Sequence, residues 1–194
     1  MRTDIISFVT TSENRKRVVT TLLEYPKRQW GCSVLEELTK LPHATVYRTI
    51  AGLTGFGLLK TIKINKKTII YELVNDSPLR GELVRVLNIE RITSEKIARI
   101  LVGNINKEIG SAILYGSAVT GNAKPSSDID ILVVLNEFDR VKERSIQDKA
   151  SELSSRFNKT ISVTVISSKE AKKNDNFIKS VKKHMVLLYG KEPF

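Results

Sequence analysis

Residues 116–135, GSAVTGNAKPSSDIDILVVL, decide how the second half of the chain folds. The apolar segment before them, 111–115, is typical of a β-strand, and a second strand is expected over 128–135. Side chains two positions apart in a strand point to the same face, about 6.5 Å from each other. The pattern therefore places the carboxylates of Asp128 and Asp130 side by side, shortly after a turn at Gly116.

Paired carboxylates at this spacing suit hard divalent cations such as Mg²⁺ or Mn²⁺, and one carboxylate can bridge two ions about 3.5 to 4 Å apart. Gly116 leaves the backbone open to close approach. If Ser117 opens a helical turn, its hydroxyl and the backbone N–H groups can hold phosphate oxygens. We therefore expect Gly116, Ser117, Asp128 and Asp130 to bind a nucleoside triphosphate, with ATP as the first candidate, and both aspartates to hold the metal and act as catalytic residues.

The order Gly-Ser, ten intervening residues and Asp-x-Asp resembles the minimal nucleotidyltransferase domain of the DNA polymerase β-like superfamily. Residues 177–179 and 187–190 also resemble the end of that domain, so the similarity spans residues 95 to 190. It implies transfer of a nucleotidyl group from a nucleoside triphosphate to a hydroxyl group, with three carboxylates at the catalytic centre. The competing interpretation is structural, with two aspartates in an exposed strand beside a glycine turn.

The chain departs from that family where a third carboxylate would be expected. The candidate strand, 160–166, carries Ser162 and Thr164 on one face and no acidic residue. Glu170 follows this strand and could reach the site only if the loop folds back. Loss of a general base typically slows a reaction by about 10² to 10⁴, so the residues favour nucleotide binding over turnover.

The first 75 residues show a different pattern. The expected elements are helices over 13–24, 33–41 and 44–54, the first capped by Ser12, followed by hairpin strands over 58–63 and 68–74 with a turn at Asn65-Lys66. This order, with Thr45-Val46-Tyr47-Arg48-Thr49-Ile50 on the third helix and Gly57-Leu58-Leu59 before the hairpin, resembles the winged helix-turn-helix family over residues 10–75. The resemblance implies that the third helix enters a DNA major groove and that the hairpin, or wing, contacts phosphates.

Two groups of side chains are candidates for contact with duplex DNA. The groove candidates on the third helix are Thr45, Tyr47, Arg48 and Thr49, and the phosphate candidates on the wing are Lys63, Lys66 and Lys67. The alternatives are that the lysine-rich turn is simply solvated, or that the domain binds another protein.

The composition agrees with a folded protein that has a polyanionic partner. Hydrophobic residues make up 41% of the 194 residues, which excludes the disordered and fibrous classes, and the net charge is +11. Residues 1–74 hold 12 basic and 6 acidic residues, so they are more basic per residue than the remainder. A single cysteine excludes an intrachain disulfide and points to the cytoplasm. Apolar runs are too short for a membrane span.

We expect an α/β (α+β) protein with a winged helix-turn-helix domain over 1–75, a connecting helix over 76–94 and a small mixed-sheet nucleotidyltransferase domain over 95–194. This order resembles archaeal-type fusions of the two modules, and winged-helix regulators often form homodimers. Three functions are open at this point. The chain is a DNA-binding regulator that also transfers nucleotides, a regulator whose second domain is an inactive nucleotide sensor, or an antitoxin that modifies a toxin.

Overall fold

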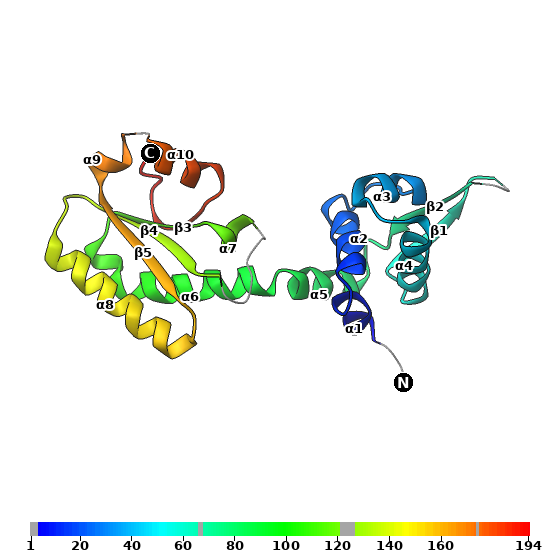
Figure 1. The fold of residues 1–194 in the computed structure, drawn as a ribbon, viewed down its shortest axis with the longest axis horizontal. Helices are drawn as coiled ribbons and strands as arrows, with labels where there is room; N and C mark the ends of the chain where they lie inside the picture. Colours follow the sequence, from blue (N-terminus) through cyan, green and yellow to red (C-terminus); the bar gives the residue numbers. More distant parts are fainter. Residues whose placement is uncertain (1–3, 66–67, 121–126, 174) are drawn as a thin grey trace. The chain divides into compact units, whose positions relative to one another are not determined.

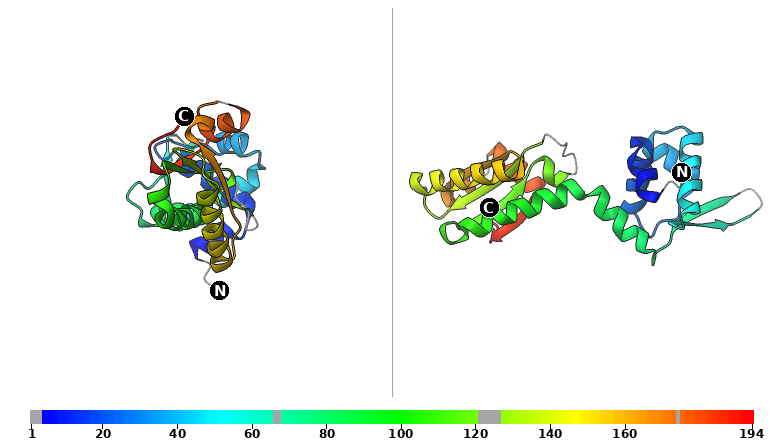
Figure 2. Two further views of the ribbon diagram at one scale, coloured as in Figure 1. Left: turned by 90° about the vertical axis from the view of Figure 1, so that its left-hand side faces the viewer. Right: turned by 90° about the horizontal axis from the view of Figure 1, so that it is seen from below.

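The structure is a computed structural model that describes residues 4–65, 68–120, 127–173 and 175–194. The chain divides into two compact units, Met1–Leu87 and Asn88–Phe194. Each unit combines helices with its own β-sheet, which confirms the expected mixed α/β class. Figures 1 and 2 follow the chain by colour from the blue N-terminal residues to the red C-terminal strand. Within the described ranges, no helix has the length and apolar character needed to cross a membrane.

The first unit has the element order expected of a winged helix. Its elements are α1 (Ile5–Thr10), α2 (Glu13–Glu24), α3 (Cys32–Thr39), α4 (His43–Gly55), β1 (Leu59–Lys63), β2 (Ile69–Leu73) and α5 (Pro78–Leu87). The side chain of Ser12 caps α2 by accepting a hydrogen bond from the Arg15 N–H. Lys40 ends α3 in the left-handed conformation, with φ 54°. The two strands pair antiparallel, with Leu59 opposite Leu73.

The helix α1 precedes the first helix expected from the sequence, 13–24. The Asp4 side chain caps it by accepting from the Ser7 N–H, and Val9 is fully buried. Its Phe8 ring packs on α4 at Gly52, where any side chain would overlap the ring. The small residue at position 52 therefore allows α1 to join the core of the first unit.

The boundary between the units lies after Leu87, further along the chain than the expected end of the first domain at residue 75. The helix α5, which had been interpreted as a connector, packs into the first core through Leu79, Leu83 and Leu87. Burial of this apolar stripe ties α5 to the residues before it. The turn at Asn75 and Asp76 thus lies within the first unit.

The second unit is a four-stranded sheet with helices on both faces. Its elements are α6 (Ile89–Ile105), the short 3-10 helix η1 (Asn106–Glu108), β3 (Ser111–Tyr115), α7 (Ser117–Thr120), β4 (Ile129–Leu135), α8 (Arg140–Phe157), β5 (Ile161–Ser167), α9 (Ser168–Ala171), α10 (Asn176–Lys183) and β6 (Val186–Gly190). The strand order is β5-β4-β3-β6, and β4 and β5 run parallel while the other neighbours run antiparallel. These strands closely match the apolar runs in the sequence.

The two faces of this sheet are covered differently. Helices α6 and α8 lie on one face, as Figures 1 and 2 show, over alternate strand residues such as Leu114 and Ile131. On the other face, α10 packs through Ile178 and Val181 against residues that include Leu132. The alternation of inward and outward side chains along β3 and β4 therefore decides which residues lie on the face that carries α10.

Candidate nucleotide site and DNA-binding surface

One row of side chains crosses three strands on the face that carries α10. Tyr115 of β3 is paired with Asp130 of β4, and Asp130 is paired with Ser162 of β5. Paired residues on neighbouring strands point to the same face, and the strands lie about 4.8 Å apart. We call Tyr115, Asp130 and Ser162 the site row.

Gly116 brings the chain close to the site row. It has φ +76°, a conformation that favours glycine, and a Cβ at this position would overlap Oδ2 of Asp130. The same Cβ would stand only 3.1 Å from Cγ of Asp130. A residue with a side chain could not occupy this turn without displacing the carboxylate.

Ser117 opens the helical turn α7, which is the condition on which its expected contact with phosphate depends. The N–H groups of Val119 and Thr120 donate to the Gly116 carbonyl at 3.2 and 3.3 Å, which closes the turn directly after the close approach to Asp130. The half-buried Ser117 thus lies at the start of a turn, where backbone N–H groups have no partner within the helix. Such N–H groups are donors from which a phosphate oxygen can accept.

The two carboxylates differ in environment. Asp128 is exposed just before β4, Asp130 is half-buried two residues later, and Ile129 between them is fully buried in the opposite core. Burial raises the pKa of Asp130, and the negative charge of Asp128 raises it further. Partial burial and mutual repulsion both disfavour two bare carboxylates, so this pair fits a divalent cation that both aspartates would hold.

Ser162 occupies the position beside Asp130 where a third carboxylate would be expected. Thr164 lies two residues further along β5, opposite Leu132, and its hydroxyl is 3.3 Å from the hydroxyl of Tyr115. Among the described residues, no group of three His, Cys, Asp or Glu side chains could hold a metal ion. The site therefore has two acids and a serine.

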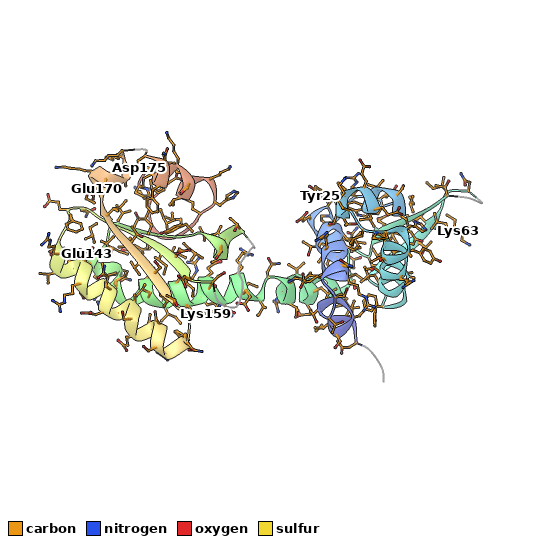
Figure 3. The ribbon with its side chains drawn as sticks, viewed as in Figure 1. Tyr25, Lys63, Glu143, Lys159, Glu170 and Asp175 are labelled. Atoms are coloured by element: carbon orange, nitrogen blue, oxygen red, sulfur yellow. The ribbon has the colours of Figure 1, made fainter. Side chains whose placement is uncertain are left out.

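Glu170 lies at the far end of β5. Ser167 lies five positions after Ser162, a distance of about 16 Å along a strand. The Glu170 carboxylate accepts hydrogen bonds from the N–H and hydroxyl of Ser167, at 2.8 and 2.7 Å, and these bonds lower its pKa. Figure 3 labels Glu170 at α9. In this structure, therefore, the loop after β5 does not bring Glu170 back to the two aspartates.

Phe177 is an aromatic residue that sequence reasoning missed, and it contacts Tyr115 of the site row. Tyr115 itself is half-buried, which raises its pKa, and its ring stands edge-on to Phe177 of α10 with the ring centroids 5.7 Å apart. The position of Tyr115 directly before Gly116 was a usable signal. Phe177 gave none, since its contact with Tyr115 depends on how α10 folds over the sheet.

In the first unit, α4 presents part of the expected DNA surface. Tyr47 is 53% exposed, Arg48 is exposed and Thr45 is half-buried. The exposed His43 at the start of α4 contacts Glu36 at 2.6 Å and stacks on Tyr47 with 6.1 Å between ring centroids. Tyr47 therefore has a neighbour that orients its ring.

Thr49 requires a correction. It was expected on the outer face of α4, but it is only 1% exposed and its hydroxyl donates to the Thr45 carbonyl at 2.8 Å. It lies four positions before Leu53, one of the buried core residues, so the two share the inner face. Thr49 thus belongs to the core.

The wing carries one described member of the lysine group. Lys63 is exposed at the end of β1, and Figure 3 shows it near the tip of the hairpin. Lys66 and Lys67 lie outside the described residues. The wing strands are held by their own ladder, with Lys63 paired to Ile69.

Comparison with known proteins identifies the second unit. The family model for polymerase beta nucleotidyltransferases matches residues 95–194. No curated protein matches the chain significantly. Among solved structures, a toxin–antitoxin complex with AMP-PNP is 20% identical, covers 50% of this chain and 74% of that chain, and gives a TM-score of 0.38.

Two further solved structures are also similar. A candidate nucleotidyltransferase from Sulfolobus solfataricus is 22% identical over 55% of this chain and 89% of its own, with a TM-score of 0.36. TrmBL2, an archaeal chromatin protein whose structure concerns DNA binding, is 14% identical over 89% of this chain and 72% of its own, with a TM-score of 0.30.

Replacing Gly116 with alanine should destabilise the second unit by about 1 to 3 kcal/mol, because the residue would be strained and its Cβ would overlap Asp130. Gly103→Ala in α6 is the matched control, since a Cβ there meets no atom within 4 Å. Denaturation followed by circular dichroism measures the change. Fluorescence of Trp30, the single tryptophan, reports the first unit and should not change. Equal stability of the two glycine variants would contradict the prediction.

Proposed function

The chain belongs to the polymerase beta nucleotidyltransferase family, and we propose that its second unit binds a nucleoside triphosphate together with Mg²⁺ or Mn²⁺. Asp128 and Asp130 would hold the cation. The turn at Gly116 and Ser117 would receive phosphate oxygens through backbone N–H groups and the serine hydroxyl. A bound divalent cation would neutralise part of the triphosphate charge and fix its orientation.

We also propose that transfer of the nucleotide by this chain is slow. The observation that supports this is the pairing of Asp130 with Ser162. A serine hydroxyl can hold a water molecule but does not accept a proton from an attacking hydroxyl near neutral pH. Glu170, the nearest acid after β5 in the sequence, is engaged at the cap of α9. The second unit is then a nucleotide-binding sensor rather than an efficient transferase.

The first unit is proposed to bind duplex DNA. Residues 1–74 carry 12 basic and 6 acidic residues, and the exposed Tyr47, Arg48 and Lys63 lie on α4 and the wing. An exposed helix flanked by basic side chains can enter a major groove while lysines neutralise phosphates. The whole chain is thus proposed to be a DNA-binding regulator that responds to a nucleotide.

The metal site is tested by Asp128→Asn combined with Asp130→Asn. We expect at least tenfold weaker binding of ATP in the presence of Mg²⁺, measured by calorimetry, because the cation loses both charged ligands. Without Mg²⁺ the double variant should bind ATP no worse than the natural chain, since the carboxylates repel a bare triphosphate. Ser117→Ala should have a smaller effect, because the backbone N–H groups remain.

Asp148→Asn is the matched control, since Asp148 is an exposed acid on α8. Its removal should leave the affinity for ATP unchanged. If the double variant bound Mg²⁺ and ATP as tightly as the natural chain, the site would have to lie elsewhere.

The slow transfer is tested by restoring an acid. Ser162→Asp should raise transfer of label from ATP labelled in the α-phosphate to acceptors in a cell lysate by at least tenfold, well within the contribution of a positioned general base. Thr164→Asp is the matched comparison and should give no gain, because Thr164 is paired with Leu132. Rapid transfer by the natural chain, or a gain from Thr164→Asp alone, would refute the assignment of Ser162.

The wing is tested by replacing Lys63, Lys66 and Lys67 with alanine in the full chain. Binding to duplex DNA should weaken for all sequences, and the slope of log affinity against log salt should flatten by about 2 to 3, since each phosphate contact releases counterions. Arg48→Ala should instead change which sequences are preferred.

Arg85→Ala, which removes an exposed charge on α5, serves as the control and should leave the slope unchanged. Absence of any DNA affinity at low salt would remove the proposed role of α4 and of the wing together.

A further inference from the structure

Phe177 is an exposed aromatic residue on a helix whose other apolar residues are buried. It is 37% exposed, whereas its neighbours Ile178 and Val181 on α10 are each 1% exposed. The first turn of α10 is fixed by Asp175, labelled in Figure 3, whose carboxylate accepts from the Ile178 N–H at 2.8 Å. The helix therefore fixes the position of Phe177, while part of its side chain stays exposed to solvent.

The position of Phe177 connects it to the site row. Its ring meets Tyr115 with an interplanar angle of 84° and 5.7 Å between centroids, and Tyr115 is the strand partner of Asp130. The hydroxyl of Tyr115 lies 3.3 Å from that of Thr164 on β5, which holds the tyrosine ring across β4. Phe177 thus stands on the aromatic border of the row that contains the buried acid.

A site for a nucleoside triphosphate must accommodate the base as well as the phosphates. If the phosphates and cation lie at Gly116, Ser117 and the two aspartates, the base extends from them and requires a flat apolar surface. The face of an aromatic ring provides such a surface for any base, and it does so without hydrogen bonds that would read the identity of the base.

We propose that Phe177 is the nucleobase contact of this site and that the chain accepts nucleoside triphosphates with little discrimination between bases such as adenine and guanine. The proposal rests on the proposed function of the acid pair. The two aspartates would hold the cation and the phosphates, and Phe177 would contact the base. Tyr115 acts as a positioning residue that supports the Phe177 ring from the sheet.

The test separates the base from the phosphates by comparing ATP, GTP and inorganic tripolyphosphate, each titrated with Mg²⁺ into the full-length chain. Phe177→Ala should weaken ATP and GTP at least fivefold, the low end of what base–aromatic stacking contributes. Tripolyphosphate should bind within twofold of the natural chain. Phe177→Trp should retain the affinity for ATP, and Phe177→Leu should lose it while preserving apolar packing. Thermal unfolding checks that α10 remains folded.

Phe138→Ala is the matched control, because Phe138 is 48% exposed and follows the opposite end of β4 from the acids. It should leave the affinity for all three ligands unchanged. Equal loss of ATP and tripolyphosphate in Phe177→Ala, or no loss of either, would overturn the role of Phe177 while leaving the acid site in place. If the natural chain bound neither tripolyphosphate nor ATP with Mg²⁺, the proposed function would fail and this proposal with it.

Discussion

The close approach of Gly116 to Asp130 is the contact on which the proposed site depends. The turn after β3 passes so near the carboxylate on β4 that a Cβ at position 116 would overlap it, and the backbone takes φ +76° to do so. One residue later, Ser117 starts the helical turn α7. A single steric constraint thus sets the turn proposed to bind phosphate beside the acid proposed to bind the metal.

Much of this arrangement could be predicted from the sequence because it is local. The apolar runs around 111–115 and 129–135 indicate the two strands and the turn between them. The choice between Ser162 and Thr164 as the neighbour of Asp130 could not be made in advance, since both lie on one face of β5 and only the register of the parallel pair separates them. The contact between Phe177 and Tyr115 likewise depends on tertiary packing.

The differences in the first unit have the same origin. Thr49 is polar and was placed outside, but its hydroxyl is satisfied by the Thr45 carbonyl, so it can be buried at little cost. Residues 76–94 were expected to form a connecting helix, but the apolar residues of α5 pack in the core of the first unit. For Thr49 the hydrogen bond is made within its own helix, and for α5 the packing partners are distant in sequence. Neither contact can be read from the local pattern of polar and apolar residues.

The most direct test of the central claim is a crystal structure of the full chain with Mg²⁺ and a non-hydrolysable ATP analogue. The account predicts a cation held by Asp128 and Asp130, phosphate oxygens at the N–H groups that follow Gly116, and no protein carboxylate from β5 in the coordination sphere. A nucleotide bound elsewhere on the second unit, or a third acid such as Glu170 on the metal, would contradict it.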